Sequence, residues 1–155
     1  MSDDHGLVEL ERVECLALLG SVSVGRFVHT ASALPGIWPV NFLLLTDAIY
    51  LRTSRGSGVW RGAEANAVIA FEADSFDAQG RYGWSVVVIS RAALVQDDRA
   101  LRQLRQLLPA PWASGEREEV VRIPLELVDG RRVGAAIPVS RSEPPPRDPT
   151  LAGSA

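Results

Sequence analysis

The sequence predicts a mostly β protein of the α+β class, with six antiparallel strands and two flanking helices around one core. A chain of 155 residues with 46% hydrophobic content is one domain's worth and can bury a compact core. Between Ser23 and Val128, short apolar runs alternate with turn residues, which is typical of a β-meander. Two longer segments, 7–19 and 97–108, carry apolar residues at helical spacing instead.

The first half of the chain predicts one helix followed by three strands. Segment 7–19 has its apolar residues on one helical face, and Gly20 follows as a stop. The dipeptide Pro35-Gly36 favours a type II turn. The expected elements after the helix are a strand at 23–31, a turn at 33–37, a strand at 39–46, a tight reversal at 47–48 and a strand at 49–53.

The second half predicts three more strands and an amphipathic helix. Glycines and serines in 54–66 indicate a loop, in which VWRGAEA could form one or two helical turns. The paired acids that begin 97–108 complement the dipole of a helix with a leucine stripe. The other elements expected are a strand at 67–73, a polar connection at 74–83 holding Asp74 and Asp77, a long strand at 84–95, a loop at 109–118 and a strand at 119–128, followed by GRRVG at 130–134.

Composition excludes several classes of chemistry. The net charge is −3, so nothing suggests a basic surface for nucleic acid. All 16 basic residues are arginines, which excludes a Schiff-base lysine and a Walker-type phosphate lysine. With one cysteine, Cys15, and two histidines, His5 and His29, neither a disulfide framework nor a histidine-rich metal site is expected.

The sequence predicts a soluble domain without a membrane span or a signal peptide. No apolar run reaches 18 residues, so no membrane span is expected, and the acidic MSDDHG start does not resemble a signal peptide. We therefore expect a cytoplasmic protein. The prediction divides the chain into a disordered N-terminus at 1–6, a folded domain at 7–139 and a disordered proline-rich tail at 140–155.

An ordered series of motifs resembles a known family. The series is ECLALLGSVSVGRF (14–27), WPVNF (38–42), LRTSRGSG (51–58), AFEAD (70–74), GWSVVV (83–88) and GRR (130–132). It is similar to the pyridoxamine 5′-phosphate oxidase-like proteins, particularly their small actinobacterial-type members. The resemblance covers residues 8 to 134 and implies an FMN-binding split β-barrel that forms a homodimer, with the flavin at the subunit interface. Arg26 in VGRF looks like a fold marker of this family.

The resemblance implies a flavin site but no catalytic side chain and no metal. Arg52, Thr53 and Ser57 match the turn that holds the flavin phosphate, since arginine and hydroxyl groups donate to phosphate oxygens. Relatives usually carry a basic residue where this chain has Gly58, so Arg55 or Arg61 would have to supply the charge. The flavin-binding residues implied are Val40, Asn41, Phe42, Arg52, Thr53, Ser54, Ser57, Gly58, Arg61, Trp84, Ser85 and Arg131.

Several of these residues also have a purely structural interpretation. Asn41 could be a strand-edge residue, Trp84 a core or interface anchor, and Arg131 a brace for the last strand. His29 is interpreted as a satisfied or exposed strand histidine. Cys15 is expected to be packed in the first helix, where nothing activates a thiolate.

The leading functional hypothesis is an FMN-dependent oxidoreductase acting on a small molecule. In such enzymes the cofactor carries the hydride chemistry, and the protein supplies position and electrostatics. A deazaflavin F420-dependent reductase is an alternative within enzymes. A non-catalytic protein that binds or sequesters a cofactor, or a split barrel without one, is the alternative outside enzymes, and Gly58 is the feature that favours it.

Overall fold

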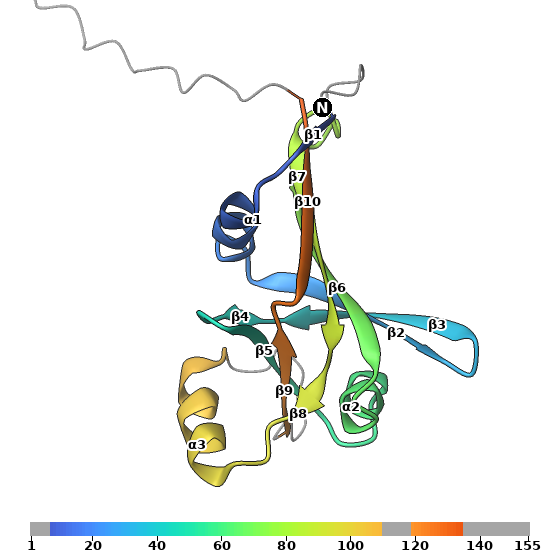
Figure 1. The fold of residues 1–155 in the computed structure, drawn as a ribbon, viewed down its shortest axis with the longest axis vertical. Helices are drawn as coiled ribbons and strands as arrows, with labels where there is room; N and C mark the ends of the chain where they lie inside the picture. Colours follow the sequence, from blue (N-terminus) through green and yellow to red (C-terminus); the bar gives the residue numbers. More distant parts are fainter. Residues whose placement is uncertain (1–6, 110–118, 135–155) are drawn as a thin grey trace, which may run out of the picture.

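The computed structural model describes residues 7–109 and 119–134, and these residues form two antiparallel sheets with three helices (Figure 1). The mostly β class is confirmed. In chain order the elements are β1 (Leu7–Glu9), α1 (Arg12–Leu19), β2 (Val24–Ala31), β3 (Leu34–Asn41), β4 (Leu43–Leu44), β5 (Ala48–Thr53), α2 (Gly58–Glu64), β6 (Val68–Phe76), β7 (Gly83–Arg91), β8 (Ala93–Leu94), α3 (Asp98–Leu107), β9 (Glu119–Pro124) and β10 (Leu127–Val133).

The larger sheet has six strands in the order β1-β10-β7-β6-β2-β3. Along β6 and β7, alternate residues are buried, as expected of strands with one face on the core. The core face carries Phe27, Phe71 and Val88, and α1 and α2 pack against this same core with Cys15, Leu19, Val59 and Ala63.

The smaller sheet has the order β4-β5-β9-β8 and is covered by α3. β5 is almost entirely buried, because its two faces meet different cores. Leu104 and Leu108 of the α3 region pack with Ala48 and Val120. Asp97 accepts a hydrogen bond from the Ala100 amide at 2.8 Å, so the predicted acidic start of this helix is confirmed.

The first helix is shorter than predicted. Residues Leu7–Glu9 form β1, which pairs with β10, and the helix begins only at Arg12. Glu11 and Glu14 form a capping box at this start, with the Glu11 amide donating to Glu14 at 3.0 Å. The prediction failed because the strand partner, GRRV of β10, lies more than a hundred residues away in sequence.

The turn predicted at 33–37 is wrong in position. The chain reverses at Ser32 and Ala33, whose φ angles are 51° and 64°, and Leu34–Asn41 is all strand. Pro35 and Gly36 sit inside β3 opposite Thr30 and His29. A proline is tolerated there because β3 is an edge strand of its sheet.

Three of the predicted strands are each divided into two. The segments 39–46, 84–95 and 119–128 change from one sheet to the other at Phe42, Ala92 and Leu125–Glu126. With β1, the described residues hold ten strands where six were expected. The connection predicted at 74–83 is also shorter, since β6 runs to Phe76 and β7 begins at Gly83, so that Asp74 lies in a strand and not in a surface loop. GRR continues β10.

Predictions for 1–6, 110–118 and 135–155, including both disordered ends and the domain limit at 139, lie outside the described residues. Within the described part, no helix is long and apolar enough to cross a membrane.

Candidate cofactor site

The turn between β5 and α2 brings two hydroxyl groups together. Thr53 ends β5 and is buried, and its Oγ1 lies 2.7 Å from Oγ of Ser57. Ser57 caps α2 by accepting a hydrogen bond from the Trp60 amide at 3.1 Å. The turn is closed by the Ser57 amide on the Ser54 carbonyl at 3.1 Å and by Gly56, whose φ is 79°. The two hydroxyls, with the turn amides, form a donor set suited to phosphate oxygens.

Arg52 does not join this hydroxyl pair within the chain. Successive strand residues point to opposite faces, so Arg52 faces away from Thr53. Its Nη2 donates to the Arg105 carbonyl and, at 3.4 Å, to the Leu108 carbonyl at the end of α3. The three residues predicted to bind the flavin phosphate are therefore not all together. Thr53 and Ser57 meet, whereas Arg52 holds α3 against the smaller sheet.

Gly58 is a glycine because an indole ring occupies the space beside it. A Cβ built on Gly58 would lie 2.1 Å from Cζ2 of Trp38, and one on Gly36 would lie 2.1 Å from Cη2 of the same ring. The Trp38 ring centroid is 6.4 Å from that of Phe27. Trp38 therefore fills the direction that a basic side chain at position 58 would take. Sequence reasoning missed Trp38, although the spacing of Gly36 and Trp38 puts both on one face of a strand.

The two arginines expected to supply charge differ in their contacts. Arg55 stacks over Trp60, with its Cζ 5.7 Å from the ring centroid, and its Nε donates to Glu119 Oε1 at 3.3 Å. Arg61 is exposed on α2. Both side chains therefore lie on the surface near the turn, and Arg55 is held there by its contacts with Trp60 and Glu119.

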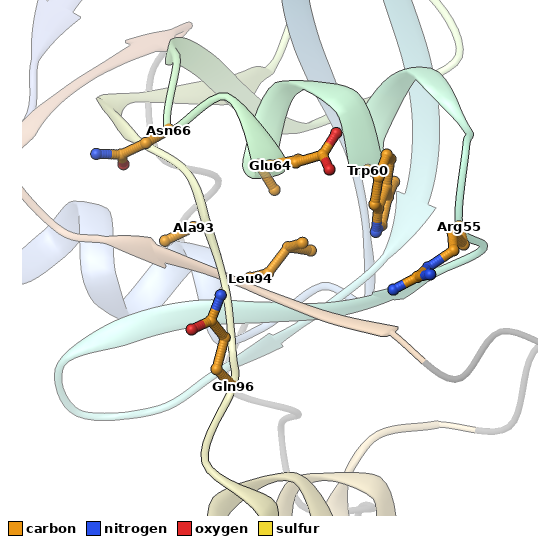
Figure 2. A pocket seen from close by; sticks show the side chains of 8 residues that line it. Arg55, Trp60, Glu64, Asn66, Ala93, Leu94 and Gln96 are labelled. Atoms are coloured by element: carbon orange, nitrogen blue, oxygen red, sulfur yellow. The ribbon is translucent and has the colours of Figure 1, made fainter.

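A cavity of about 460 Å³ lies beside α2, between this helix and β8 (Figure 2). Figure 2 shows the Trp60 indole nitrogen and the Arg55 guanidinium turned towards the space next to Leu94. The indole nitrogen is buried and has no hydrogen-bond partner among the described residues. Sequence analysis did not identify this cavity, because its walls come from two elements about thirty residues apart. Its lining residues are Arg55, Trp60, Ala63, Glu64, Asn66, Ala93, Leu94 and Gln96.

The predicted residues of the WPVNF segment have different environments. Phe42 is a core residue, 3% exposed, and its ring packs edge-on against Phe71 at 4.9 Å. Its amide donates to the Ser23 carbonyl at 3.0 Å, so both the ring and the N–H of Phe42 are already engaged. Asn41 is half-buried opposite Val24. Val40 packs against the core, so Asn41 lies on the opposite face of β3. Asn41 is the polar side chain that this segment offers.

Trp84, Ser85 and Arg131 lie at the far end of the larger sheet. Ser85 is opposite Arg131, and Trp84 is opposite Arg132, where β7 meets β10. Figure 1 shows that this end of the sheet is well separated from α2. One chain therefore does not bring these residues to the β5–α2 turn.

The outer face of the larger sheet carries a charged cluster. Arg26 Nη1 is 2.8 Å from Glu72 and 3.4 Å from Asp74. Burial raises the pKa of the Glu72 carboxyl, against the opposing effect of Arg26. The pKa of Arg26 is raised by its hydrogen bond to Glu72. Because the partners come from β2 and β6, this cluster fastens two neighbouring strands.

Cys15 and His29 do not form a reactive centre. Cys15 is fully buried, as predicted, and burial raises the pKa of its thiol, which opposes thiolate formation. His29 is 9% exposed and lies beneath Gly62 of α2, and its Nδ1 has no partner in the part of the chain that the structure describes, so the expectation of a satisfied or exposed histidine is wrong for this atom. No group of three or more metal-ligating side chains occurs among residues 7–109 and 119–134.

Comparison with known proteins defines the class. The family model described as pyridoxamine 5′-phosphate oxidase matches residues 11–132. An uncharacterized protein of Mycobacterium tuberculosis is 41% identical over 133 residues, which is 83% of this chain and 87% of the relative. The chain therefore belongs to the pyridoxamine 5′-phosphate oxidase family, as the ordered motifs predicted.

Two solved structures resemble this fold over most of its length. A protein of Corynebacterium glutamicum that carries the pyridoxamine 5′-phosphate oxidase name is 32% identical, with a TM-score of 0.70, covering 88% of this chain and all of its own. The FAD-binding protein of Mycobacterium smegmatis is 30% identical, with a TM-score of 0.63, covering 81% of this chain and 97% of its own.

Proposed function

We propose that this protein binds a flavin and uses it for electron or hydride transfer with a small-molecule substrate. The observation that carries the proposal is the Thr53–Ser57 hydroxyl pair, 2.7 Å apart, at the turn from β5 into α2. The similarity to the FAD-binding protein of Mycobacterium smegmatis supports a flavin as the ligand. We expected FMN, and this similarity makes FAD an equal candidate.

The residues of the turn fit a flavin phosphate in part. Thr53 and Ser57 supply hydroxyl donors, and Gly56 leaves open space, since a Cβ there would meet nothing within 4 Å. Trp38 closes the position beside Gly58, and Arg55 is held by Trp60 and Glu119, so positive charge has to come from Arg61. A missing charged hydrogen bond costs about 1.5–3 kcal/mol, or one to two decades of affinity. We therefore expect weaker phosphate binding than in a site with a basic residue at 58.

A bound flavin would supply the redox chemistry, and the chain would supply position. Thr53 and Ser57 would fix the phosphate end, and Asn41 would offer its amide to the polar edge of the ring. No substrate-specific acid or base is assigned.

Trp84, Ser85 and Arg131 can take part only if a second copy supplies them, and we propose a homodimer. The outer face of the larger sheet carries an apolar row across five strands, formed in register by Leu127, Ile89, Ala70, Val28 and Ile37. Leu127, Ile37 and Ile89 are 67%, 65% and 42% exposed. Apolar patches of this kind mark interaction surfaces.

The dimer is tested by light scattering on the eluting protein. We expect a mass of twice the chain for the native protein and of one chain for Ile89→Glu. Val13→Glu, at an exposed position on α1, is the matched control and should leave the mass unchanged. A native mass of one chain would contradict the dimer without bearing on flavin binding.

The flavin proposal is tested by comparing FMN, FAD, F420 and riboflavin in fluorescence titrations. Riboflavin lacks the phosphate, so it separates phosphate contacts from ring contacts. Ser57→Asp keeps a favourable helix cap but places a negative charge at the phosphate position. We expect it to weaken FMN and FAD binding by at least about tenfold and riboflavin binding by less than about twofold.

The control for this titration is Thr30→Val, an exposed threonine on β2, compared with Thr53→Val on β5. Only the substitution at position 53 should weaken FMN binding. Binding of F420 alone would move the function to deazaflavin chemistry. Binding of none of these ligands would indicate a split barrel that acts without a flavin.

We also propose that the protein works in the cytoplasm, because its single cysteine is free and buried.

A further inference from the structure

The cavity between α2 and β8 is separate from the hydroxyl pair of the proposed flavin site. Its walls are the Trp60 ring and Ala63 on the helix and Ala93 and Leu94 on the strand. A volume of about 460 Å³ is within the range of small-ligand pockets. Arg55 lines the cavity and does not contact the Thr53–Ser57 hydroxyl pair. The cavity therefore has a charged group that the hydroxyl pair does not use.

One polar atom in this cavity lacks the partner that burial normally requires. The Trp60 Nε1–H is buried and has no acceptor within residues 7–109 and 119–134, although an indole N–H usually finds one when it is removed from water. Figure 2 shows this nitrogen on the side of the ring that faces the space between Leu94 and Arg55. The N–H is therefore placed to donate to an acceptor atom of a ligand.

A cation lies beside the same ring. The Arg55 guanidinium carbon is 5.7 Å from the Trp60 centroid, and its Nε donates to Glu119 at 3.3 Å. This contact uses one of the five donors of the guanidinium, so its Nη groups can form a fork with a second carboxylate. Glu64 is the other charged residue of the lining, and in Figure 2 its carboxylate points along the helix towards Trp60, not towards Arg55.

We infer that this cavity binds a small, flat aromatic carboxylate. The carboxylate would accept from the Trp60 indole N–H and from Arg55, and the ring would lie on the apolar wall formed by Ala63, Ala93 and Leu94. Asn66 and Gln96, which also line the cavity, add neutral donors and acceptors that select among ring substituents. The inference does not depend on flavin binding.

The experiment uses 2-naphthoate as the probe and 2-naphthamide as its uncharged match. In a nitrogen–proton correlation spectrum, each tryptophan gives one indole N–H signal, and the signal lost in Trp60→Phe identifies Trp60. Titration of the full chain with 2-naphthoate should move this signal and saturate below about 1 mM, whereas 2-naphthamide should bind at least about fivefold more weakly.

Two variants and one control test the assigned contacts. Arg55→Gln and Trp60→Phe each remove one donor and should weaken 2-naphthoate binding by about tenfold. Arg81→Gln removes an exposed arginine outside the cavity and should change the affinity by less than about twofold. Saturating FMN should leave the 2-naphthoate affinity unchanged.

An indole signal that does not move, or an equal loss of affinity in Arg55→Gln and Arg81→Gln, would overturn the inference. Competition between FMN and 2-naphthoate would also overturn it, because the cavity would then belong to the flavin site. A failure of FMN to bind, with 2-naphthoate still bound, would refute the proposed function alone.

Discussion

The contact between Gly58 and Trp38 predicts the direction in which Gly58→Ala changes the stability of the fold. Gly58 is the first residue of α2, and an alanine in a helix is ordinarily more stable than a glycine by up to about 1 kcal/mol. In this protein, however, the added Cβ would lie 2.1 Å from the indole ring of Trp38. We therefore expect Gly58→Ala to destabilise the fold instead of stabilising it.

The magnitude follows from what has to move. The ring cannot withdraw freely, because Gly36 approaches it from β3 and Phe27 packs beside it. Overpacking of this kind costs about 1–3 kcal/mol. After a gain in helix propensity of about 1 kcal/mol is subtracted, we expect a net loss of up to about 2 kcal/mol, which for a chain of this length lowers Tm by up to roughly 8 °C.

The assay is thermal and urea unfolding followed by far-ultraviolet circular dichroism, so that loss of a tryptophan does not alter the signal. The same substitution is made in a Trp38→Leu background, where the space beside position 58 is open. There Gly58→Ala should be neutral or stabilising, which gives a coupling of at least about 1 kcal/mol between the two positions. An equal effect of Gly58→Ala in both backgrounds would refute the steric reasoning.

Three further predictions concern Arg52, Glu72 and Cys15. Arg52→Leu should lower the free energy of unfolding by about 1–3 kcal/mol, because two carbonyls at the end of α3 lose their donor, while FMN affinity changes by less than about twofold in the titration above. Burial raises the pKa of Glu72 above its ordinary value of 4.5, so the folded state holds this proton more tightly than the unfolded state. The stability of the native protein relative to Glu72→Gln should therefore fall as the pH rises from 4.5 towards neutral in urea titrations, and a constant difference would contradict the assignment. Cys15 should react with a thiol reagent only as fast as the chain unfolds, since it is fully buried and its thiol pKa is raised; rapid labelling under native conditions would contradict this.

The strands with strong local signals were predictable from sequence. The β-branched runs of β2, β6 and β7, the leucine stripe of α3 and the short helix within 54–66 each depend on residues adjacent in the chain. The elements that were missed depend on distant partners. β1 is a strand because GRRV of β10 pairs with it, and β3 keeps Pro35 because it lies at the edge of the sheet.

The candidate site was predictable at the level of the turn but not of its side chains. Thr53 and Ser57 do meet, because a strand end and a helix cap place them four residues apart. Strand alternation turns Arg52 away from Thr53, but its partners could not be predicted from sequence, because they depend on where the end of α3 packs. The cavity beside Trp60 and the position of Trp38 likewise depend on contacts between separate elements.

The Trp38 ring also makes the missing charge at position 58 testable. If steric closure explains why this position is glycine, removing the ring should let a basic residue return to the start of α2, beside Thr53 and Ser57. The double variant Trp38→Leu/Gly58→Lys should then bind FMN about tenfold more tightly than Trp38→Leu alone, with riboflavin unchanged, since one charged contact to the phosphate is gained. Gly58→Lys with Trp38 intact should lose stability as Gly58→Ala does. A tighter FMN complex for both lysine variants would show that the ring does not control this position, and no gain in either would place the phosphate elsewhere.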